Sequence, residues 1–330
     1  MNKTRYTFLV PSYKASFLEE ALESIKNQTY TDFKVLVSDD CSPENLKPIY
    51  EKVCGNDPRF AFRRNEANMG GKSLVSHWNL LVDLCDTEYL IMASDDDVYE
   101  PKFLEEIDAL VNKYPTVDIL RAKARRTENG KLAREDFNLD EYMTFAQFAY
   151  TFGELPIVTC LANYVFRTSR LKEQGYFPDF PAAAKSDSAT AMLMAQNGIV
   201  STPDVLFTFR ISNENLSSVS GYAKNILNVA TADLMFVDWY AEKMKPLLDK
   251  LPAEQVYLRP WVDKAHKSHV EGILQYLMPQ MKLRDLLFFL KAFKQRGYLL
   301  GTIDNMVIWK NWIKKESNIL NHRYEDSNSI

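Results

Sequence analysis

Short apolar runs alternate with stretches of helical periodicity from residue 5 to about residue 124. An apolar run of four or five residues is typical of a buried strand, and apolar residues spaced three and four apart are typical of an amphipathic helix. Strands are expected at residues 6–10, 34–38, 59–64, 89–92 and 118–124. Helices are expected at residues 16–28, after Pro43, and at residues 73–84 and 102–114. This alternation predicts stacked βα units and a mostly parallel sheet.

Turn and capping residues mark several boundaries. Ser16 is followed three residues later by Glu19, which predicts a capping box at the start of the first helix. Asn129-Gly130 predicts a turn. Further on, residues 189–196 have helical spacing, and Asn197-Gly198 is expected to end that helix.

The pattern changes again near residue 220. Strand and helix signals mix up to that point, and from residue 222 onward only helical periodicity is found. The sequence therefore predicts an α/β domain over residues 1–220 and an all-helical C-terminal appendage over residues 221–330. Within the first domain, the sheet is expected to be mostly parallel and flanked by helices.

Composition and charge exclude several classes of protein. Of the 330 residues, 46% are hydrophobic and 25% are charged, which suits a folded protein with a large core. The net charge of -4 is too balanced for a general nucleic-acid binder. The four cysteines lack metal-ligand spacing and fit reduced thiols. Since no apolar run approaches the roughly 20 residues that span a bilayer, we expect a cytoplasmic protein that meets membranes only from the surface.

Acidic residues follow two of the expected strands at their carboxyl ends. They form an acidic pair, Asp39-Asp40, and an acidic triplet, Asp95-Asp96-Asp97. Ligands of open α/β sheets bind outside the carboxyl ends of the strands. Three consecutive carboxylates repel one another unless a cation neutralises them, and Mg²⁺ or Mn²⁺ bridging a diphosphate is a natural partner. The alternative for the triplet is an acidic turn that caps the helix after Pro101.

Residues 70–73, Gly-Gly-Lys-Ser, stand before a helix as the end of a P-loop does. A P-loop also needs a glycine where this chain has Glu66, so a P-loop NTPase is excluded. No Gly-x-Gly-x-x-Gly follows the first strand, which argues against a dinucleotide-dependent dehydrogenase. Gly70 is instead expected to permit a tight turn near a bound donor, and Lys72 is a candidate partner of a phosphate or an acid.

Together these motifs resemble the family-2 glycosyltransferases, which have the GT-A nucleotide-sugar fold. The resemblance covers residues from about 5 to 220 and is weaker beyond residue 150. Cys41 stands where the family has a glycine after its paired acids. The matching segments are the opening strand and loop at 8–13, the first helix and its exit at 18–30, the paired acids at 37–42, the Asn-x-Gly loop at 65–70 and the Asp-x-Asp segment at 94–101.

The resemblance implies a role for each of these residues. One acid of the acidic pair would accept the uracil N–H, the loop from Pro11 to Tyr13 would line the base and ribose, and Asp95 would face the ribose. The metal ligands would be Asp96 and Asp97, with Mg²⁺ or Mn²⁺ as the cofactor. The residues expected to border the nucleotide-sugar are Pro11, Tyr13, Asp39, Asp40, Asn68, Gly70, Lys72 and Asp95.

The resemblance continues into the expected acceptor half, residues 125–220, which follows the nucleotide-binding half, residues 1–124. Ser186-Asp187 resembles the Glu-Asp segment that holds the catalytic base. An inverting transfer needs one carboxylate to take the proton of the acceptor hydroxyl, and the resemblance assigns this role to Asp187. The alternative for Asp187 is an acid placed at a helix N-terminus by the helix dipole. Residues 209–217 resemble the family's closing segment, with Ser212 where a histidine is common.

The sequence thus predicts a metal-dependent, inverting glycosyltransferase of polysaccharide synthesis. A UDP-sugar is the expected donor, and a glycan or lipid-linked glycan is the expected acceptor. One alternative is a sugar nucleotidyltransferase, which would normally carry a loop rich in glycine and basic residues where this chain has residues 11–14. The other is a non-catalytic scaffold that binds nucleotide or glycan, against which Asp95, Asp96 and Asp187 argue.

Residues 282–315 combine basic and aromatic side chains. Eight lysines and arginines oppose two aspartates there, which gives 8 − 2 = +6 in a protein whose net charge is -4. Such a pattern on amphipathic helices suits peripheral contact with the inner face of the cell membrane. The alternative is a helical appendage whose apolar face packs on the catalytic domain or on a second copy in a homodimer.

Overall fold

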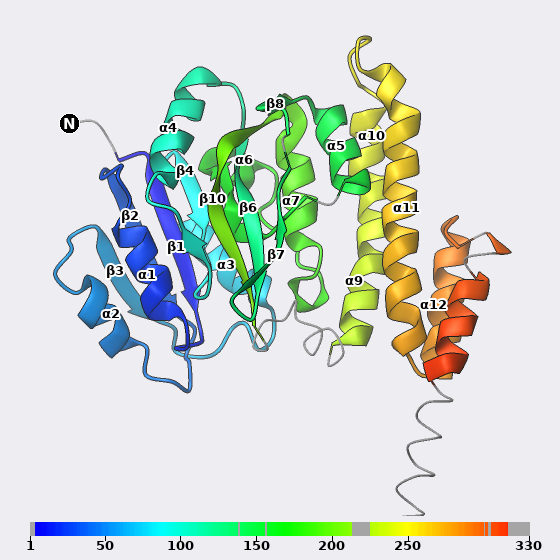
Figure 1. Cartoon of the computed structure of the whole chain (residues 1–330), viewed down its shortest axis with the longest axis horizontal. Coiled ribbons are helices and arrows are strands. Elements are labelled where there is room, and N and C mark those ends of the chain that lie inside the picture. Colours follow the sequence, from blue (N-terminus) through cyan, green and yellow to red (C-terminus); the bar gives the residue numbers. More distant parts are fainter. Residues whose placement is uncertain are drawn as a thin grey trace, which may run out of the picture.

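The computed structural model describes residues 4–137, 139–155, 157–212, 225–299, 301–302 and 305–315. These residues form a large mixed sheet covered by helices, with further helices packed beside it (Figure 1). The predicted α/β class and the C-terminal helices are confirmed. No helix in the described ranges has both the length and the hydrophobicity needed to cross a bilayer.

The sheet has ten strands in the order β3-β2-β1-β4-β9-β6-β10-β5, with β7 beside β6 and β8 beside β10. The strands are β1 Tyr6–Ser12, β2 Phe33–Asp39, β3 Phe60–Arg64, β4 Tyr89–Met92, β5 Val98–Tyr99, β6 Ile119–Glu128, β7 Lys131–Glu135, β8 Tyr142–Met143, β9 Tyr164–Arg167 and β10 Ile199–Ile211. The α-helices are α1 Leu18–Lys26, α2 Lys47–Cys54, α3 Leu74–Leu84, α4 Phe103–Lys113, α5 Phe145–Glu154, α6 Thr168–Glu173, α7 Ser186–Met194, α9 Ile226–Trp239, α10 Lys245–Leu248, α11 Arg259–Leu277 and α12 Leu283–Gln295.

The first four strands are parallel and lie in the predicted places. Their register aligns the carboxyl ends, since Ser12 of β1 pairs with Asp39 of β2, and Asp39 pairs with Arg64 of β3. β1 is buried because helices cover both faces of the sheet, which explains its continuous apolar run. The polar residues that follow these strands therefore emerge along one edge of the sheet.

The second half of the sheet mixes strand directions. β9 runs antiparallel to β4 and β6, whereas β10 runs parallel to β6. The turn predicted at Asn129-Gly130 is confirmed, since both residues have positive φ (50° and 74°) and join β6 to β7. The sequence pattern did not predict β7, because all five of its residues are exposed and show no apolar alternation.

The predicted capping box at Ser16 is wrong. α1 begins at Leu18, and its N-cap residue is Phe17, whose side chain makes no capping hydrogen bond. Glu19 forms an ion pair with Lys52 of α2 and so ties two surface helices together. A capping box is found instead at α5, where the Thr144 side chain and Gln147 bond reciprocally.

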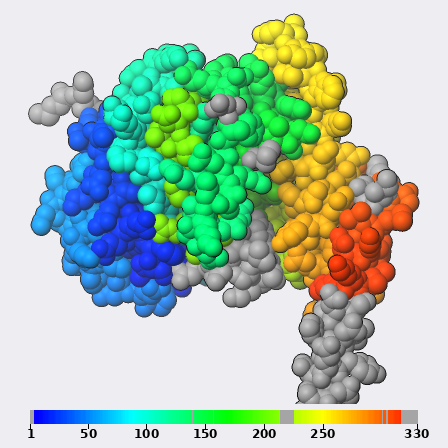
Figure 2. Space-filling view, viewed as in Figure 1, coloured from blue at the N-terminus to red at the C-terminus, as the bar shows by residue number. Residues whose placement is uncertain are grey.

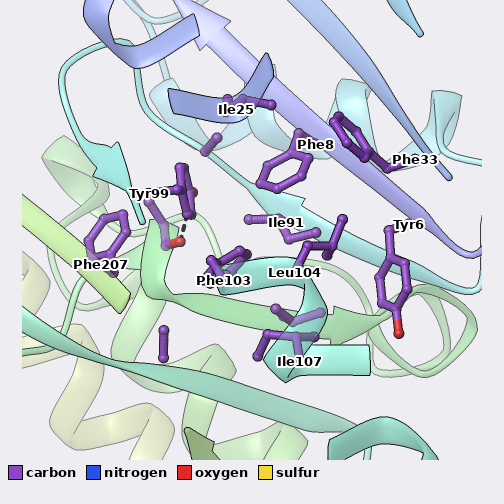
Figure 3. Packing of buried hydrophobic residues seen from close by; sticks show 14 of the residues in the cluster. Tyr6, Phe8, Ile25, Phe33, Ile91, Tyr99, Phe103, Leu104, Ile107 and Phe207 are labelled. Carbon is purple, nitrogen blue, oxygen red and sulfur yellow. Dashed lines mark hydrogen bonds between the residues drawn. The ribbon is translucent and has the colours of Figure 1, made fainter. Parts of the chain in front are cut away.

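An aromatic cluster fills the space between α1, α4 and the sheet (Figure 3). The ring of Phe8 lies 5.3 Å from that of Tyr99, and Tyr99 lies 4.7 Å from Phe103 and 5.1 Å from Phe207. The Tyr99 hydroxyl donates a hydrogen bond to the Ala162 carbonyl at 2.8 Å. Because Tyr99 follows the acidic triplet closely, this packing fixes the segment that carries the triplet.

A buried ion pair supports the segment that precedes β9. Arg121 and Asp136 are both fully buried, and their side chains contact each other at 2.5 Å. Asp136 also accepts hydrogen bonds from the backbone N–H groups of Ala124 (2.9 Å) and Val158 (2.7 Å). The pair thereby holds residues 157–163 against β6.

The C-terminal helices pack on the sheet domain through α5 and α11 (Figure 1). Gly153 of α5 lies against the backbone of Ala265 in α11, so close that a Cβ atom there would come within 2.9 Å of the Ala265 carbonyl carbon. The absence of a side chain at residue 153 thus permits the two helices to touch.

We expect Gly153→Ala to destabilise the protein by about 1–3 kcal/mol, because the added methyl group forces α5 and α11 apart. Gly272→Ala in α11 is the matched control. It meets no atom within 4 Å, so the helix propensity of alanine should stabilise the protein by about 0.5–1 kcal/mol. Urea unfolding of both variants measures the two changes. Equal stabilisation by both would contradict the close contact at Gly153.

Candidate active site

The acidic triplet lies in the loop between β4 and β5, and all three side chains are buried. Asp95 Oδ2 accepts hydrogen bonds from the backbone N–H groups of Tyr13 (2.8 Å) and Lys14 (2.9 Å). Burial raises the pKa of Asp95, while the Lys14 ammonium and these two N–H groups act in the opposite direction. The triplet is therefore bound directly to the loop that follows β1.

Lys14 supplies a positive charge to the triplet. Its Nζ donates a hydrogen bond to Asp96 Oδ2 and lies 3.7 Å from Asp95 Oδ1. Burial lowers the pKa of Lys14, but attraction to Asp95 and Asp96 outweighs it, so the pKa is raised and the ammonium stays charged. Apart from its place in the loop after β1, no feature of the sequence points to Lys14.

Asp97 connects the triplet to β10. Its Oδ1 accepts a hydrogen bond from the Arg210 backbone N–H at 2.8 Å, and its Oδ2 accepts one from the Ser94 hydroxyl. Burial, together with repulsion from Asp96, raises the pKa of Asp97 to about 8. Both oxygens of Asp97 thus accept hydrogen bonds from within the protein. The Asp96 carboxylate instead contacts the flexible side chain of Lys14.

The two acids of the acidic pair have different partners. Asp39 accepts a hydrogen bond from the Ser42 N–H at 2.8 Å and forms an ion pair with Arg64. Asp40 accepts hydrogen bonds from the Asn65 side chain (2.7 Å) and from the N–H of Gly70 (2.7 Å). Asp40 therefore holds the loop at residues 65–70 in place. Arg64 pairs with Asp39 across β2 and β3, a register that the sequence alone does not reveal.

Two positions in these loops favour a residue without a side chain, one for its backbone conformation and one for lack of space. Cys41 has a φ of 54°, a left-handed conformation that favours glycine. This conformation explains why the family that the chain resembles has a glycine at this position. A Cβ atom on Gly70 would lie 3.0 Å from Asp40 Oδ2, so the missing side chain permits the close approach of loop and carboxylate. Asn68 accepts a hydrogen bond from the Gly71 N–H, and Lys72 is exposed beside it.

Tyr13 joins the triplet to the acidic pair. Its N–H donates to Asp95, and its carbonyl accepts a hydrogen bond from the Ser42 hydroxyl at 2.6 Å. The Tyr13 ring is half exposed, and Pro11 precedes it in β1, opposite Ser38. The structure therefore joins Tyr13, Asp95 and the acidic pair through hydrogen bonds along one edge of the sheet, whereas Pro11 and the Lys72 side chain stand outside these bonds.

Asp187 lies in the first turn of α7, after a segment with unusual backbone conformations. Ala182, Ala183 and Lys185 all have positive φ, between 54° and 70°, which L-residues adopt at a cost. Asp187 Oδ1 accepts hydrogen bonds from the N–H (2.7 Å) and the hydroxyl (3.2 Å) of Ser188. Burial raises the pKa of Asp187, and the Lys185 ammonium partly offsets this rise.

The buried thiol of Cys160 is influenced by carboxylates of both the triplet and α7. Burial holds the pKa of the Cys160 thiol well above its usual range, and the carboxylates of Asp97 and Asp187 both contribute to this rise. Asp187 and Asp97 thus act electrostatically on the same buried residue. In addition, the Ser73 hydroxyl at the start of α3 donates to Asp179 at 2.8 Å, which ties the loop at residues 70–73 to the segment before α7.

The donor set of the triplet suits a hard divalent cation. Mg²⁺ usually takes one or two protein carboxylates and completes its shell with phosphate oxygens and water. Asp96 and Asp97 offer that number of carboxylates at the edge of the sheet, since each Asp97 oxygen keeps a second lone pair beside the one hydrogen bond that it accepts. Among the described residues, no group of three or more histidine, cysteine or acidic side chains is arranged as a closed metal cage.

Residues 7–169 match the model of glycosyl transferase family 2. This part of the chain belongs to glycosyl transferase family 2. The family-2 resemblance seen in the motifs is thereby confirmed.

Several curated glycosyltransferases are similar in sequence to this chain. The poly(ribitol-phosphate) beta-N-acetylglucosaminyltransferase TarS of Staphylococcus aureus is 24% identical over 221 residues, which cover 65% of this chain and 37% of TarS. The chondroitin synthase of Escherichia coli is 32% identical over 97 residues, which cover 29% of this chain and 14% of the synthase. The chain therefore aligns with well under half the length of these relatives.

Solved structures extend the similarity to most of the chain. The crystal structure of S. aureus TarS residues 1–349 in complex with UDP-GlcNAc gives a TM-score of 0.55 at 18% identity and covers 95% of this chain and 92% of that one. The mannosyltransferase of Pyrobaculum calidifontis in complex with GDP-Man and Mn²⁺ gives 0.52 at 17% identity, with 94% and 86% covered. At these identities the similarity shows the fold, which is the predicted GT-A type.

Proposed function

We propose that the protein transfers a sugar from a UDP-sugar to a hydroxyl group of a glycan or lipid-linked glycan, with inversion at the anomeric carbon. The observation that carries the proposal is the placement of Asp95 and Asp96. Backbone N–H groups of Tyr13 and Lys14 hold Asp95 at the carboxyl edge of the parallel strands, where such sheets bind nucleotides.

In this proposal the acidic pair and the loop after β1 bind the nucleotide. Asp39 accepts the uracil N–H, and the half-exposed Tyr13 ring lies against the base and ribose. Asp40 holds the loop at residues 65–70, so that Asn68 and Gly70 border the donor. Lys72 is exposed two residues beyond this loop, and in the proposal its ammonium group contacts a phosphate of the donor.

In this proposal Asp96 would be the principal ligand of a Mg²⁺ or Mn²⁺ ion, with Asp97 as the second candidate. Such a cation stabilises the negative charge that develops on the departing diphosphate. A neighbouring structure that holds GDP-Man and Mn²⁺ supports this assignment. Ser212 stands where the closing segment of the family commonly has a histidine, so the proposal assigns no third metal ligand there.

Asp187 is the proposed general base. The acceptor oxygen forms a bond to the anomeric carbon as the bond from that carbon to the diphosphate breaks, and the hydroxyl proton passes to Asp187. Its raised pKa makes it a better proton acceptor than an ordinary aspartate. The products are the glycoside and UDP. All four cysteines are free thiols, which supports a cytoplasmic location.

Binding of UDP in the presence of Mn²⁺ is the direct test of the donor site. A ligand present at about 100 times its dissociation constant stabilises the native state by about 2.7 kcal/mol, which thermal unfolding detects. We expect Asp39→Ala to weaken UDP binding about 10–150-fold, since a hydrogen bond to a charged acceptor is worth about 1.5–3 kcal/mol. Asp86→Ala, at a solvent-exposed acid between α3 and β4, is the matched control and should leave UDP binding unchanged.

The alternatives predict other ligands. A nucleotidyltransferase would be stabilised by a nucleoside triphosphate with a sugar phosphate, and a scaffold would bind UDP-sugar without metal-dependent hydrolysis. If UDP with Mn²⁺ fails to stabilise the wild-type protein, the proposal is wrong.

A further inference from the structure

The C-terminal helices bury only part of their apolar residues. On α12, the side chains of Leu286, Phe289 and Phe293 pack against α9 and α11. The Trp312 indole N–H donates a hydrogen bond to the Met281 carbonyl at 3.0 Å, which anchors the helical residues 305–315 on the same core. Packing against the rest of the chain therefore accounts for the apolar side chains on the inner face of these helices. It does not account for those on the outer face.

The outer face carries large apolar side chains in solvent. Leu287 and Phe288 project from α12, and Met306 and Ile313 project from the helical residues 305–315. Phe288 and Met306 are 62% and 65% exposed. These helices form one end of the molecule, away from the parallel strands (Figure 2).

An open groove with a volume of about 580 Å³ runs between the two helices. Leu287, Leu290 and Trp309 give it an apolar lining, and Lys291 and Lys294 line it as well. Apolar side chains beside lysines are the arrangement of helices that lie in a membrane interface, where the apolar groups enter the acyl boundary and the ammonium groups meet phosphates.

The charge of this region distinguishes between two possible partners of the outer face, a second copy of the chain and a lipid surface. Among the described residues from 282 to 315, eight are lysine or arginine and only Asp285 is acidic. Two copies of such a face would bring like charges together, which costs binding energy. An anionic lipid surface attracts the same lysines, by an amount that corresponds to about a fivefold gain in binding for each.

We propose that this face docks the protein on an anionic bilayer surface. The docking surface consists of Leu287, Phe288, Met306 and Ile313 together with Lys291 and Lys294. It is independent of the donor site, so it can fail while the proposed transfer stands. A lipid-linked acceptor would give the docking a purpose, because it would bring enzyme and acceptor to the same surface.

Co-sedimentation with vesicles of equimolar phosphatidylglycerol and phosphatidylcholine tests the proposal on the full chain. We expect binding at about 0.05 M salt that weakens strongly at about 0.5 M, since salt screens the attraction. Phe288→Glu combined with Met306→Glu should abolish binding. Leu132→Glu on β7 is the matched control, because Leu132 is 63% exposed but lies outside the docking surface.

The lysines can be tested separately. Lys291→Gln combined with Lys294→Gln should lower binding to these vesicles about 25-fold, and Lys131→Gln, an exposed lysine on β7, should not change it. Absence of vesicle binding at low salt would overturn the proposal. A dimer in sedimentation equilibrium that Phe288→Glu dissociates would also overturn it and make the surface an interface between copies of the chain.

Discussion

Asp187→Asn is expected to lower the rate of sugar transfer about 10²–10⁴-fold while leaving UDP affinity unchanged. Asparagine keeps the shape of the side chain and can still accept the hydrogen bonds of Ser188 through its amide oxygen. It cannot take a proton at neutral pH. Single-turnover transfer to an acceptor glycan measures the rate, and calorimetry with UDP and Mn²⁺ measures the donor affinity.

The pH dependence of the transfer rate gives a second test of Asp187, by comparison of the wild type with Asp187→Asn. Burial raises the pKa of Asp187 above that of an ordinary aspartate, so the base is lost by protonation at a higher pH than usual as the solution is acidified. The acid limb of the rate profile should therefore lie at a higher pH than an unperturbed aspartate would give, and it should disappear in Asp187→Asn. Asp249→Asn, an exposed acid after α10, serves as the control. Transfer at a near wild-type rate in Asp187→Asn would place the base elsewhere.

The parts of the fold that the sequence predicts are those with a local physical signal. A strand covered on both faces is a continuous apolar run, and β1, β2 and β4 were located from such runs to within two residues at each end. The acidic pair and the acidic triplet follow directly from these strand ends. Their convergence on one edge then follows from the parallel arrangement alone.

The remaining features depend on contacts that no local pattern records. β7 lies on the surface, and its pairing with β6 depends on the Asn129-Gly130 turn rather than on apolar alternation. The positive φ values of Ala182, Ala183 and Lys185 are fixed by the surroundings of the segment, since alanine has no preference for them.

The same holds for two charges at the site. Arg64 meets Asp39 because of the strand register, and Lys14 reaches Asp96 because the backbone N–H of Lys14 already binds Asp95. Lys14 directly follows Tyr13, and its distance in sequence from the acids is not distinctive. Only the folded loop shows that Lys14 contacts Asp96. The sequence thus locates the acids of the site but not the cations that balance them.

Asp96→Asn is expected to remove the gain in UDP affinity that Mn²⁺ provides, by on the order of 100-fold or more. Loss of a residue that only supports a metal ligand typically costs about 10–100-fold, and Asp96 is proposed to be the ligand itself. Calorimetry with UDP, with and without Mn²⁺, separates the metal-dependent gain from nucleotide binding alone, which should not change.

The fold should tolerate Asp96→Asn, because the substitution removes one of three buried and mutually repelling carboxylates. Repulsion from Asp96 contributes to the raised pKa of Asp97, so we expect that pKa to fall toward its ordinary range in the variant. Lys14 retains Asp95 as a partner at 3.7 Å and stays charged. Asp97→Asn is the informative comparison, since Asp97 accepts hydrogen bonds from Ser94 and from the Arg210 backbone, and its loss should loosen the link to β10. If Mn²⁺ still strengthens UDP binding in Asp96→Asn by the wild-type factor, Asp96 is not the metal ligand, and the triplet serves only to position the loop after β1.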